Sequence, residues 1–133
     1  MVKLIVGGKG SGKTKLLLEA VRQGVQNSDG NVVFIDNSDQ HAFEIDHNVR
    51  LINALNYNVD SCDKFHGFIA GILAGNYDIT DIYVDAILRI VGRDYDKLGE
   101  MLEAIDKISE DVTVMITISA DTDKLPESVM KFA

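Results

Sequence analysis

The sequence predicts an α/β fold in three layers, with a parallel five-stranded sheet between two layers of helices. Short apolar stretches typical of strands alternate with longer stretches in which apolar residues recur at helical spacing. This alternation is typical of parallel sheets with helices on their faces. The first apolar stretch also runs directly into a glycine-rich segment that precedes a helical pattern. The length of 133 residues fits one domain, residues 1–133.

The strand-like and helix-like stretches can be placed in order along the chain. Strands are expected at residues 2–6, 32–35, 49–52, 82–84 and 112–118, the last being the richest in β-branched residues. About four helices are expected: one from Lys13 to the turn at residues 27–30, a second capped by Ser61 or Asp63, a third capped by Asp94, and a short last helix with Pro126 in its first turn. In the third helix, apolar residues repeat at helical spacing from Tyr95 to Ile108.

The segment after the first strand carries a complete phosphate-binding motif. Residues 7–14 read Gly-Gly-Lys-Gly-Ser-Gly-Lys-Thr and satisfy the pattern G-x-x-x-x-G-K-[ST]. Glycines let successive backbone N–H groups turn inward around a phosphate, and the positive end of the following helix adds to the attraction. The predicted nucleotide-binding residues are Gly7, Gly8, Lys9, Gly10, Ser11, Gly12, Lys13, Thr14 and Lys15.

This motif implies a nucleotide with a magnesium ion. Lys13 is expected to reach the β and γ phosphates, which also makes it a predicted catalytic residue, and Thr14 is expected to place its hydroxyl on Mg²⁺. No motif distinguishes adenine from guanine, so the expected cofactors are ATP or GTP with Mg²⁺.

Two aspartates at the ends of predicted strands are candidate metal ligands. Such a site requires a carboxylate at the end of a neighbouring strand. Asp85 follows the strand at residues 82–84 and is the first candidate, and Asp36 follows the strand at residues 32–35 and is the second. Many ATPases place a glutamate directly after this aspartate, but Ala86 stands there. Hydrolysis is therefore expected to be slow, or to use a base from elsewhere.

On these motifs the chain resembles the RecA-like group of P-loop NTPases. The matching segments are residues 7–14, residues 33–36 with the polar stretch to His41, residues 83–85, and the strand ending in Thr117 and Ser119, which looks like the polar sensor strand of that group. The resemblance implies the strand order 3-2-4-5-1. The chain also looks like short stand-alone bacterial P-loop proteins described as relatives of the twitching-motility ATPase.

The same resemblance suggests a catalytic base and an arginine. In that group the catalytic glutamate can lie just after the second strand, which by position corresponds to Ser38, with Asp39 close by. Because serine cannot act as a general base, Asp39 is the candidate. Arg89 or Arg93 could complete the site of a neighbouring subunit, or could simply form surface ion pairs with Asp94 or Asp96.

The composition limits which binding partners and which cellular compartment are expected for this chain. The formal net charge of −8 and the absence of a basic patch outside residues 9–15 argue against nucleic acid as a partner. The single cysteine, Cys62, excludes an intrachain disulfide. Neither a signal peptide nor a membrane-spanning stretch is visible, so a cytoplasmic location is expected.

Three functions fit these observations. The first is Mg²⁺-dependent nucleotide binding, foremost of ATP, with weak or partner-dependent hydrolysis. The second is a nucleotide-gated interaction module without hydrolysis, in which residues 86–94 contact a protein partner or another copy of the chain. The apolar residues of this segment could equally cover the sheet. The third, a small-molecule kinase, is the least favoured, because none of the four arginines lies in an obvious lid.

Overall fold

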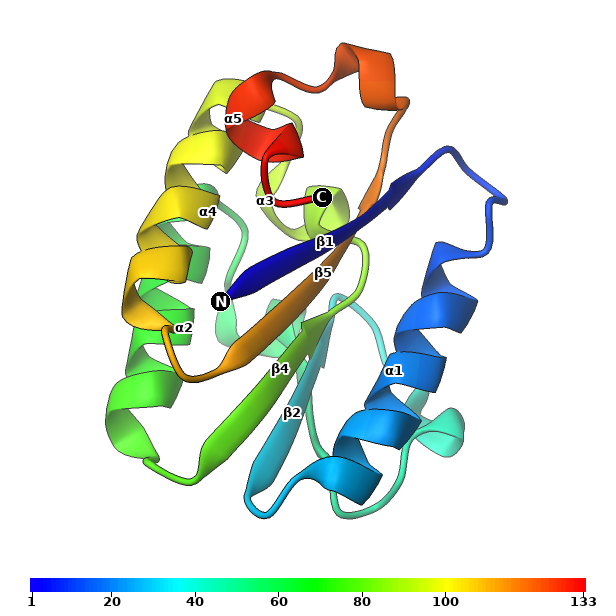
Figure 1. Cartoon of the computed structure of the whole chain (residues 1–133), viewed down its shortest axis with the longest axis vertical. Coiled ribbons are helices and arrows are strands. Elements are labelled where there is room, and N and C mark those ends of the chain that lie inside the picture. The colour runs from blue at the N-terminus through cyan, green and yellow to red at the C-terminus, as the bar shows by residue number, and fades with distance from the viewer.

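A five-stranded parallel sheet forms the centre of the computed structural model, which describes all of residues 1–133 (Figure 1). Every strand pairing is parallel. The predicted fold class is therefore confirmed. The strands are β1 (Val2–Gly7), β2 (Asn31–Asp36), β3 (Arg50–Asn53), β4 (Ile79–Val84) and β5 (Thr113–Ser119).

The strand order brings the predicted site elements together. The order is β1-β5-β4-β2-β3, which is the predicted order read from the opposite edge of the sheet. Strand β5 thus lies between β1 and β4, with Gly7 paired to Ser119. On the other side of β4, Val84 pairs with Ile35. Because parallel strands end at the same edge, the polar residues that follow β1, β5, β4 and β2 gather there.

The chain forms five α-helices, where about four were expected. The predicted caps are present: Ser61 accepts a hydrogen bond from the Lys64 backbone N–H, and Asp94 accepts one from Lys97. Helix α3 was not predicted, because a helix of five residues is too short to show a repeating pattern. The helices are α1 (Lys13–Asn27), α2 (Cys62–Gly75), α3 (Ile87–Val91), α4 (Tyr95–Ile108) and α5 (Glu127–Met130).

The helices divide into two layers, each with its own apolar core. Helix α1 covers one face of the sheet, whereas α2, α4 and α5 cover the other (Figure 1). Under α1, Leu17 and Val21 belong to a cluster that includes Phe34 of β2 and Tyr83 of β4. The larger cluster on the opposite face joins α2, α3, α4 and α5 to the sheet. Ile108, the final residue of α4 and of its apolar repeat, is 43% exposed.

The apolar residues after Asp85 cover the sheet and do not form an exposed surface. Ile87, Leu88 and Ile90 are all buried in the larger cluster. The apolar side chains of residues 86–94 were expected either to contact a partner or to cover the sheet, and the structure favours the second alternative. No helix in the chain combines the length and the apolar character that crossing a membrane would require.

Candidate functional site

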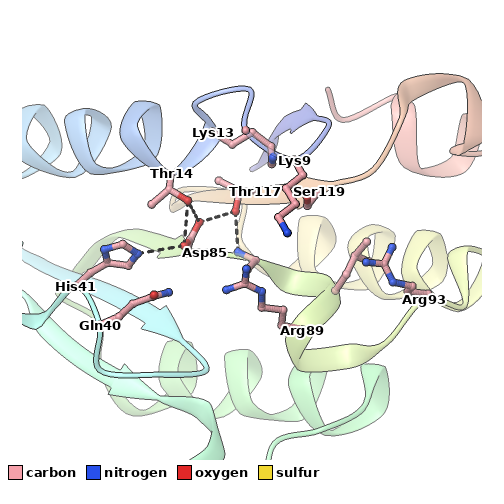
Figure 2. A pocket seen from close by; sticks show the side chains of 13 residues that line it. Lys9, Lys13, Thr14, Gln40, His41, Asp85, Arg89, Arg93, Thr117 and Ser119 are labelled. Carbon is pink, nitrogen blue, oxygen red and sulfur yellow. Dashed lines mark hydrogen bonds and ion pairs between the residues drawn. The ribbon is translucent and has the colours of Figure 1, made fainter.

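A pocket of about 480 Å³ lies at the carboxyl ends of the strands (Figure 2). The loop after β1, the ends of β5 and β4, helix α3 and the loop after β2 all contribute to it. Topology alone accounts for this position, because each of these segments follows a parallel strand. The lining residues are Lys9, Gly10, Lys13, Thr14, Gln40, His41, Asp85, Ala86, Leu88, Arg89, Arg93, Thr117 and Ser119.

The loop between β1 and α1 requires its glycines. Gly10 and Gly12 have φ values of 81° and 87°, in the left-handed region that disfavours residues with a side chain. A Cβ atom at Gly7 would lie 2.5 Å from the Ser11 hydroxyl oxygen, so no larger residue fits there without a shift. The glycines therefore allow a loop conformation that residues with side chains would disfavour.

The side chain of Lys13 folds back and contacts the loop that precedes it. Its Nζ donates a hydrogen bond of 2.8 Å to the Gly8 carbonyl oxygen and lies 3.5 Å from the Ser11 hydroxyl oxygen. An ammonium group has three donors, so this arrangement leaves capacity for a further acceptor in the pocket. Together with Lys9, Lys13 places two cations on the loop side of the pocket (Figure 2).

Asp85 is the centre of a hydrogen-bonded network. The Thr14 hydroxyl lies 3.2 Å from its Oδ1 and 3.3 Å from its Oδ2. Thr117 of β5 donates a 2.8 Å hydrogen bond to Oδ1 and accepts a 2.7 Å bond from the Ala86 backbone N–H. Asp85 is only 2% exposed. The carboxylate predicted as a metal ligand is therefore buried, fixed in orientation and in contact with the predicted hydroxyl ligand.

Backbone strain marks the point where the chain leaves Asp85. Ala86 has φ 57° and ψ 58°, a left-handed conformation that costs a non-glycine residue roughly 1 kcal/mol. The hydrogen bond from its N–H to Thr117 holds this geometry. The strained residue thus joins the Asp85 network to α3, which carries Arg89 into the pocket.

Asp36 lies beside Asp85 at the carboxyl edge of the sheet. The Asp85 N–H donates to the Ile35 carbonyl, so the two aspartates follow adjacent strands side by side. Asp36 is 2% exposed and accepts hydrogen bonds from the Asn37 N–H and the Ser38 hydroxyl. Burial raises the pKa of Asp36 above its usual value; the hydrogen bond from Asn37 opposes this rise, and the nearby Asp85 carboxylate adds to it. Two buried carboxylates this close favour binding of a cation.

His41 reaches the same carboxylates from the loop after β2. Its Nε2 lies 3.6 Å from Asp85 Oδ2, and its ring packs edge-on against Phe34 with centroids 6.4 Å apart. Ligand atoms of Asp36, His41 and Asp85 all lie within 4.8 Å of one another. Sequence reasoning named His41 within a matching polar stretch but did not place it beside Asp85. No spacing rule predicts this contact, because the path of the loop decides it.

Two arginines face the loop lysines across the pocket. Arg89 of α3 and Arg93 just after it both line the pocket, and neither forms an ion pair with Asp94 or Asp96. Lys9 and Lys13 are likewise free of carboxylate partners. In a chain of net charge −8, four cations with no ion-pair partner thus face one cavity.

The predicted site residues that do not line this pocket are Gly7, Gly8, Ser11, Gly12, Lys15, Asp36 and Asp39. Asp39 is exposed and lines a smaller neighbouring hollow with Asp36, whereas Gln40 and His41 from the same loop reach the main pocket. Lys15, the third residue of α1, is exposed and does not line the pocket. The roles assigned to Asp39 and Lys15 remain predictions.

Solved structures share the fold of this chain. A KaiC-like protein, PH0186 from Pyrococcus horikoshii OT3, matches 98% of the chain at 18% identity with a TM-score of 0.68, over 68% of its own length. Domain III of the replication initiation protein DnaA from Thermotoga maritima matches 98% of the chain at 16% identity with a TM-score of 0.51, over 50% of its length. The chain therefore shares with these structures an α/β fold, which here is built on a parallel five-stranded sheet.

Sequence comparisons add no narrower assignment. No protein-family model matches the chain, and a comparison with curated protein sequences gives no match.

Proposed function

We propose that this protein binds a nucleoside triphosphate, foremost ATP, together with Mg²⁺ on the loop at residues 7–14. The observation that carries the proposal is the meeting of Lys13, Thr14 and Asp85 in one pocket, with the Thr14 hydroxyl 3.2 Å from the Asp85 carboxylate. Lys13 and Thr14 begin α1, whereas Asp85 follows β4, far away in the sequence. A chance glycine-rich turn would have no reason to meet a buried carboxylate in this way.

The oxygen donors in the pocket fit Mg²⁺. Hydroxyl and carboxylate oxygens are the protein ligands that Mg²⁺ prefers, and they leave room for water and phosphate oxygens. Thr14 and Asp85 would hold the ion, with Asp36 beside them. The bound ion would neutralise phosphate charge. Thr117 keeps the Asp85 carboxylate oriented through its hydrogen bond to Oδ1.

The four cations around the pocket suit a polyphosphate. Lys9 and Lys13 approach from the loop, and Arg89 and Arg93 approach from the opposite wall (Figure 2). Because both arginines line the pocket of their own chain, they can contact phosphates without a second subunit. Completion of a neighbouring subunit's site by Arg89 or Arg93 remains an alternative. The pocket charge favours phosphates over a neutral ligand.

Hydrolysis in the isolated chain should be weak. Asp85 is the only carboxylate that lines the pocket, and its hydrogen bonds with Thr14 and Thr117 suit it to binding the metal ion rather than to accepting a proton. Gln40 lines the pocket and could orient a water molecule, but an amide does not accept its proton. Asp39 remains the candidate base and would need a movement of its loop to reach the pocket.

Calorimetric titration tests nucleotide binding. Wild type should bind ATP in the presence of Mg²⁺. Lys13→Ala should bind ATP at least about tenfold more weakly, because a charged hydrogen bond of roughly 1.5–3 kcal/mol is lost. The control Lys107→Ala removes a distant cation on α4 and should bind ATP as wild type does. Titration with GTP gives the base preference. Equal affinity of Lys13→Ala and wild type would refute the proposal.

Phosphate release tests the hydrolysis. We expect slow turnover that rises with protein concentration if a second copy contributes a group, and a further loss in Asp39→Asn if Asp39 is the base. Release that is absent at every concentration, with and without partners, would exclude the enzymatic part of the proposal.

A nucleotide-gated interaction module is the second candidate. The hydrogen bonds from Asp85 through Thr117 to the strained Ala86 link the pocket directly to residues 86–94. A ligand that moves Asp85 would therefore bias the position of α3 and its arginines. Identical partner binding with and without nucleotide would exclude this candidate. Transfer of labelled γ-phosphate to a small acceptor would instead support the less favoured kinase.

A further inference from the structure

Three side chains next to the proposed nucleotide site have the arrangement of a metal centre with one nitrogen ligand. Asp36 and Asp85 follow adjacent strands, and His41 returns from the loop after β2 to face both (Figure 2 shows His41 and Asp85). Their ligand atoms lie within 4.8 Å of one another, and the two aspartates are each only 2% exposed. No lysine or arginine forms an ion pair with either carboxylate.

The distance between His41 and Asp85 suits two ligands of one ion better than a direct bond. The 3.6 Å between Nε2 and Oδ2 is well beyond the roughly 2.7–2.9 Å of a charge-assisted hydrogen bond. Nitrogen and oxygen ligands about 2.1 Å from a common metal ion lie roughly 3–4 Å apart. From the outer limit of 4.8 Å for the three residues, the ligand atoms that lie farthest apart would approach each other by roughly 1 Å on binding.

The second nitrogen of His41 provides an independent observation. Nδ1 is a buried polar atom with no hydrogen-bond partner, and the Glu44 carboxylate oxygen Oε2 lies 3.5 Å away. A histidine that binds metal through one nitrogen typically donates its other N–H to a carboxylate, which fixes the ring and the tautomer. The aspartates are supported similarly, Asp36 by Asn37 and Ser38, and Asp85 by Thr117.

We propose that Asp36, His41 and Asp85 bind a divalent transition-metal ion of the Mn²⁺ or Fe²⁺ class directly, without nucleotide. Mg²⁺ takes oxygen ligands almost exclusively, whereas one imidazole with two carboxylates suits manganese and iron. The centre shares Asp85 with the proposed nucleotide site but does not depend on Lys13. Because His41 lies in the loop after β2, this loop would determine which metal ion the chain prefers. Glu44 acts as a positioning residue that orients His41.

Titration of the nucleotide-free protein with Mn²⁺ tests the proposal. Binding is monitored by the decrease in the electron paramagnetic resonance signal of free Mn²⁺. We expect one ion per chain, with Mg²⁺ competing at least tenfold more weakly. His41→Ala should weaken Mn²⁺ binding by more than about tenfold, and Glu44→Gln by on the order of tenfold. The matched control is His47→Ala, because His47 is 92% exposed beside Asp46. Equal Mn²⁺ affinity of His41→Ala and wild type would overturn the proposal.

A spectroscopic measurement on wild type removes any dependence on the folding of variants. Electron spin echo modulation of bound Mn²⁺ should show one directly bonded imidazole nitrogen, and its absence would overturn the proposal. The Lys13→Ala variant separates the two proposals: it should keep Mn²⁺ binding and lose nucleotide. Mn²⁺ binding that occurs only with nucleotide would refute the separate metal centre and leave the nucleotide proposal standing.

Discussion

At the scale of single residues, the buried Asp85 determines how its neighbours are arranged. A buried carboxylate is costly unless hydrogen bonds or a cation compensate it. Thr14 and Thr117 supply hydroxyls from two different elements, and Thr117 also satisfies the N–H of the strained Ala86. One threonine on β5 therefore supports both the carboxylate and the turn that follows it.

Replacing this hydroxyl should be costly although the shape of the side chain is kept. In Thr117→Val, the Ala86 N–H loses its partner and Asp85 loses a donor, so we expect about 1–3 kcal/mol of destabilisation in chemical denaturation. Thr113→Val on the same strand, where no side-chain hydrogen bond is broken, should change stability by less than about 0.5 kcal/mol. Equal effects of the two substitutions would contradict the role of Thr117.

Tyr83 gives a prediction about pH. Burial, and secondly the charge of Asp81, which also accepts its hydrogen bond, raise the pKa of Tyr83 far above its usual value. A raised folded-state pKa means that its stabilising contribution is complete below the unfolded value of about 10 and is lost as pH rises above it. Unfolding free energy should therefore fall above about pH 10, and less steeply in Tyr83→Phe.

Phenolate absorbance gives the direct check. Between about pH 8 and 11, folded wild type and folded Tyr83→Phe should gain the same absorbance, because Tyr83 stays protonated in that range. The extra phenolate should appear only when wild type unfolds. A smaller gain in folded Tyr83→Phe would show that Tyr83 ionises normally.

At the scale of elements, the close packing of α1 on the sheet depends on a glycine. The Tyr83 hydroxyl lies 3.2 Å from the Ala20 carbonyl oxygen of α1, and a Cβ at Gly24 would overlap that hydroxyl. Tyr83 is buried at 3% exposure and cannot turn away easily. Glycine at position 24 has a low helix propensity, but the absence of a side chain there allows α1 to pack closely against β4.

Alanine substitutions in two helices should have opposite effects. Gly24→Ala should destabilise by about 1–2 kcal/mol, since overpacking outweighs the gain of about 1 kcal/mol in helix propensity. Gly67→Ala in α2, where a Cβ meets nothing within 4 Å, should stabilise by up to about 1 kcal/mol. The cost of Gly24→Ala should shrink in a Tyr83→Phe background, as a double-mutant cycle would show. An unchanged cost there would exclude the contact with the hydroxyl.

Elements with strong local signals could be predicted, and those set by tertiary context could not. The glycine motif, the caps Ser61 and Asp94 and the apolar strands all follow local rules, and the strand order follows from the resemblance. Helix α3 has too few residues to show periodicity. The places of His41 and Asp39 depend on the path of one loop, which brings the histidine to Asp85 and leaves the aspartate outside the pocket.

At the scale of the whole molecule, charge is distributed unevenly. The chain carries a net charge of −8, yet Lys9, Lys13, Arg89 and Arg93 line one pocket. A net negative molecule repels anions at long range, whereas a cavity lined by cations attracts them locally. The sheet makes this arrangement possible, because strands distant in sequence end side by side at the same edge.

Thermal unfolding with and without Mg²⁺ and ATP, on wild type and Lys13→Ala, tests the central claim most directly. At a nucleotide concentration of a hundred times the dissociation constant, binding should stabilise wild type by about 2.7 kcal/mol. For a domain of this size that raises Tm by several degrees, and Lys13→Ala should show little of this increase. No shift in wild type shown to be free of carried-over ligand, or the same shift in both proteins, would contradict the claim that residues 7–14 bind a nucleotide.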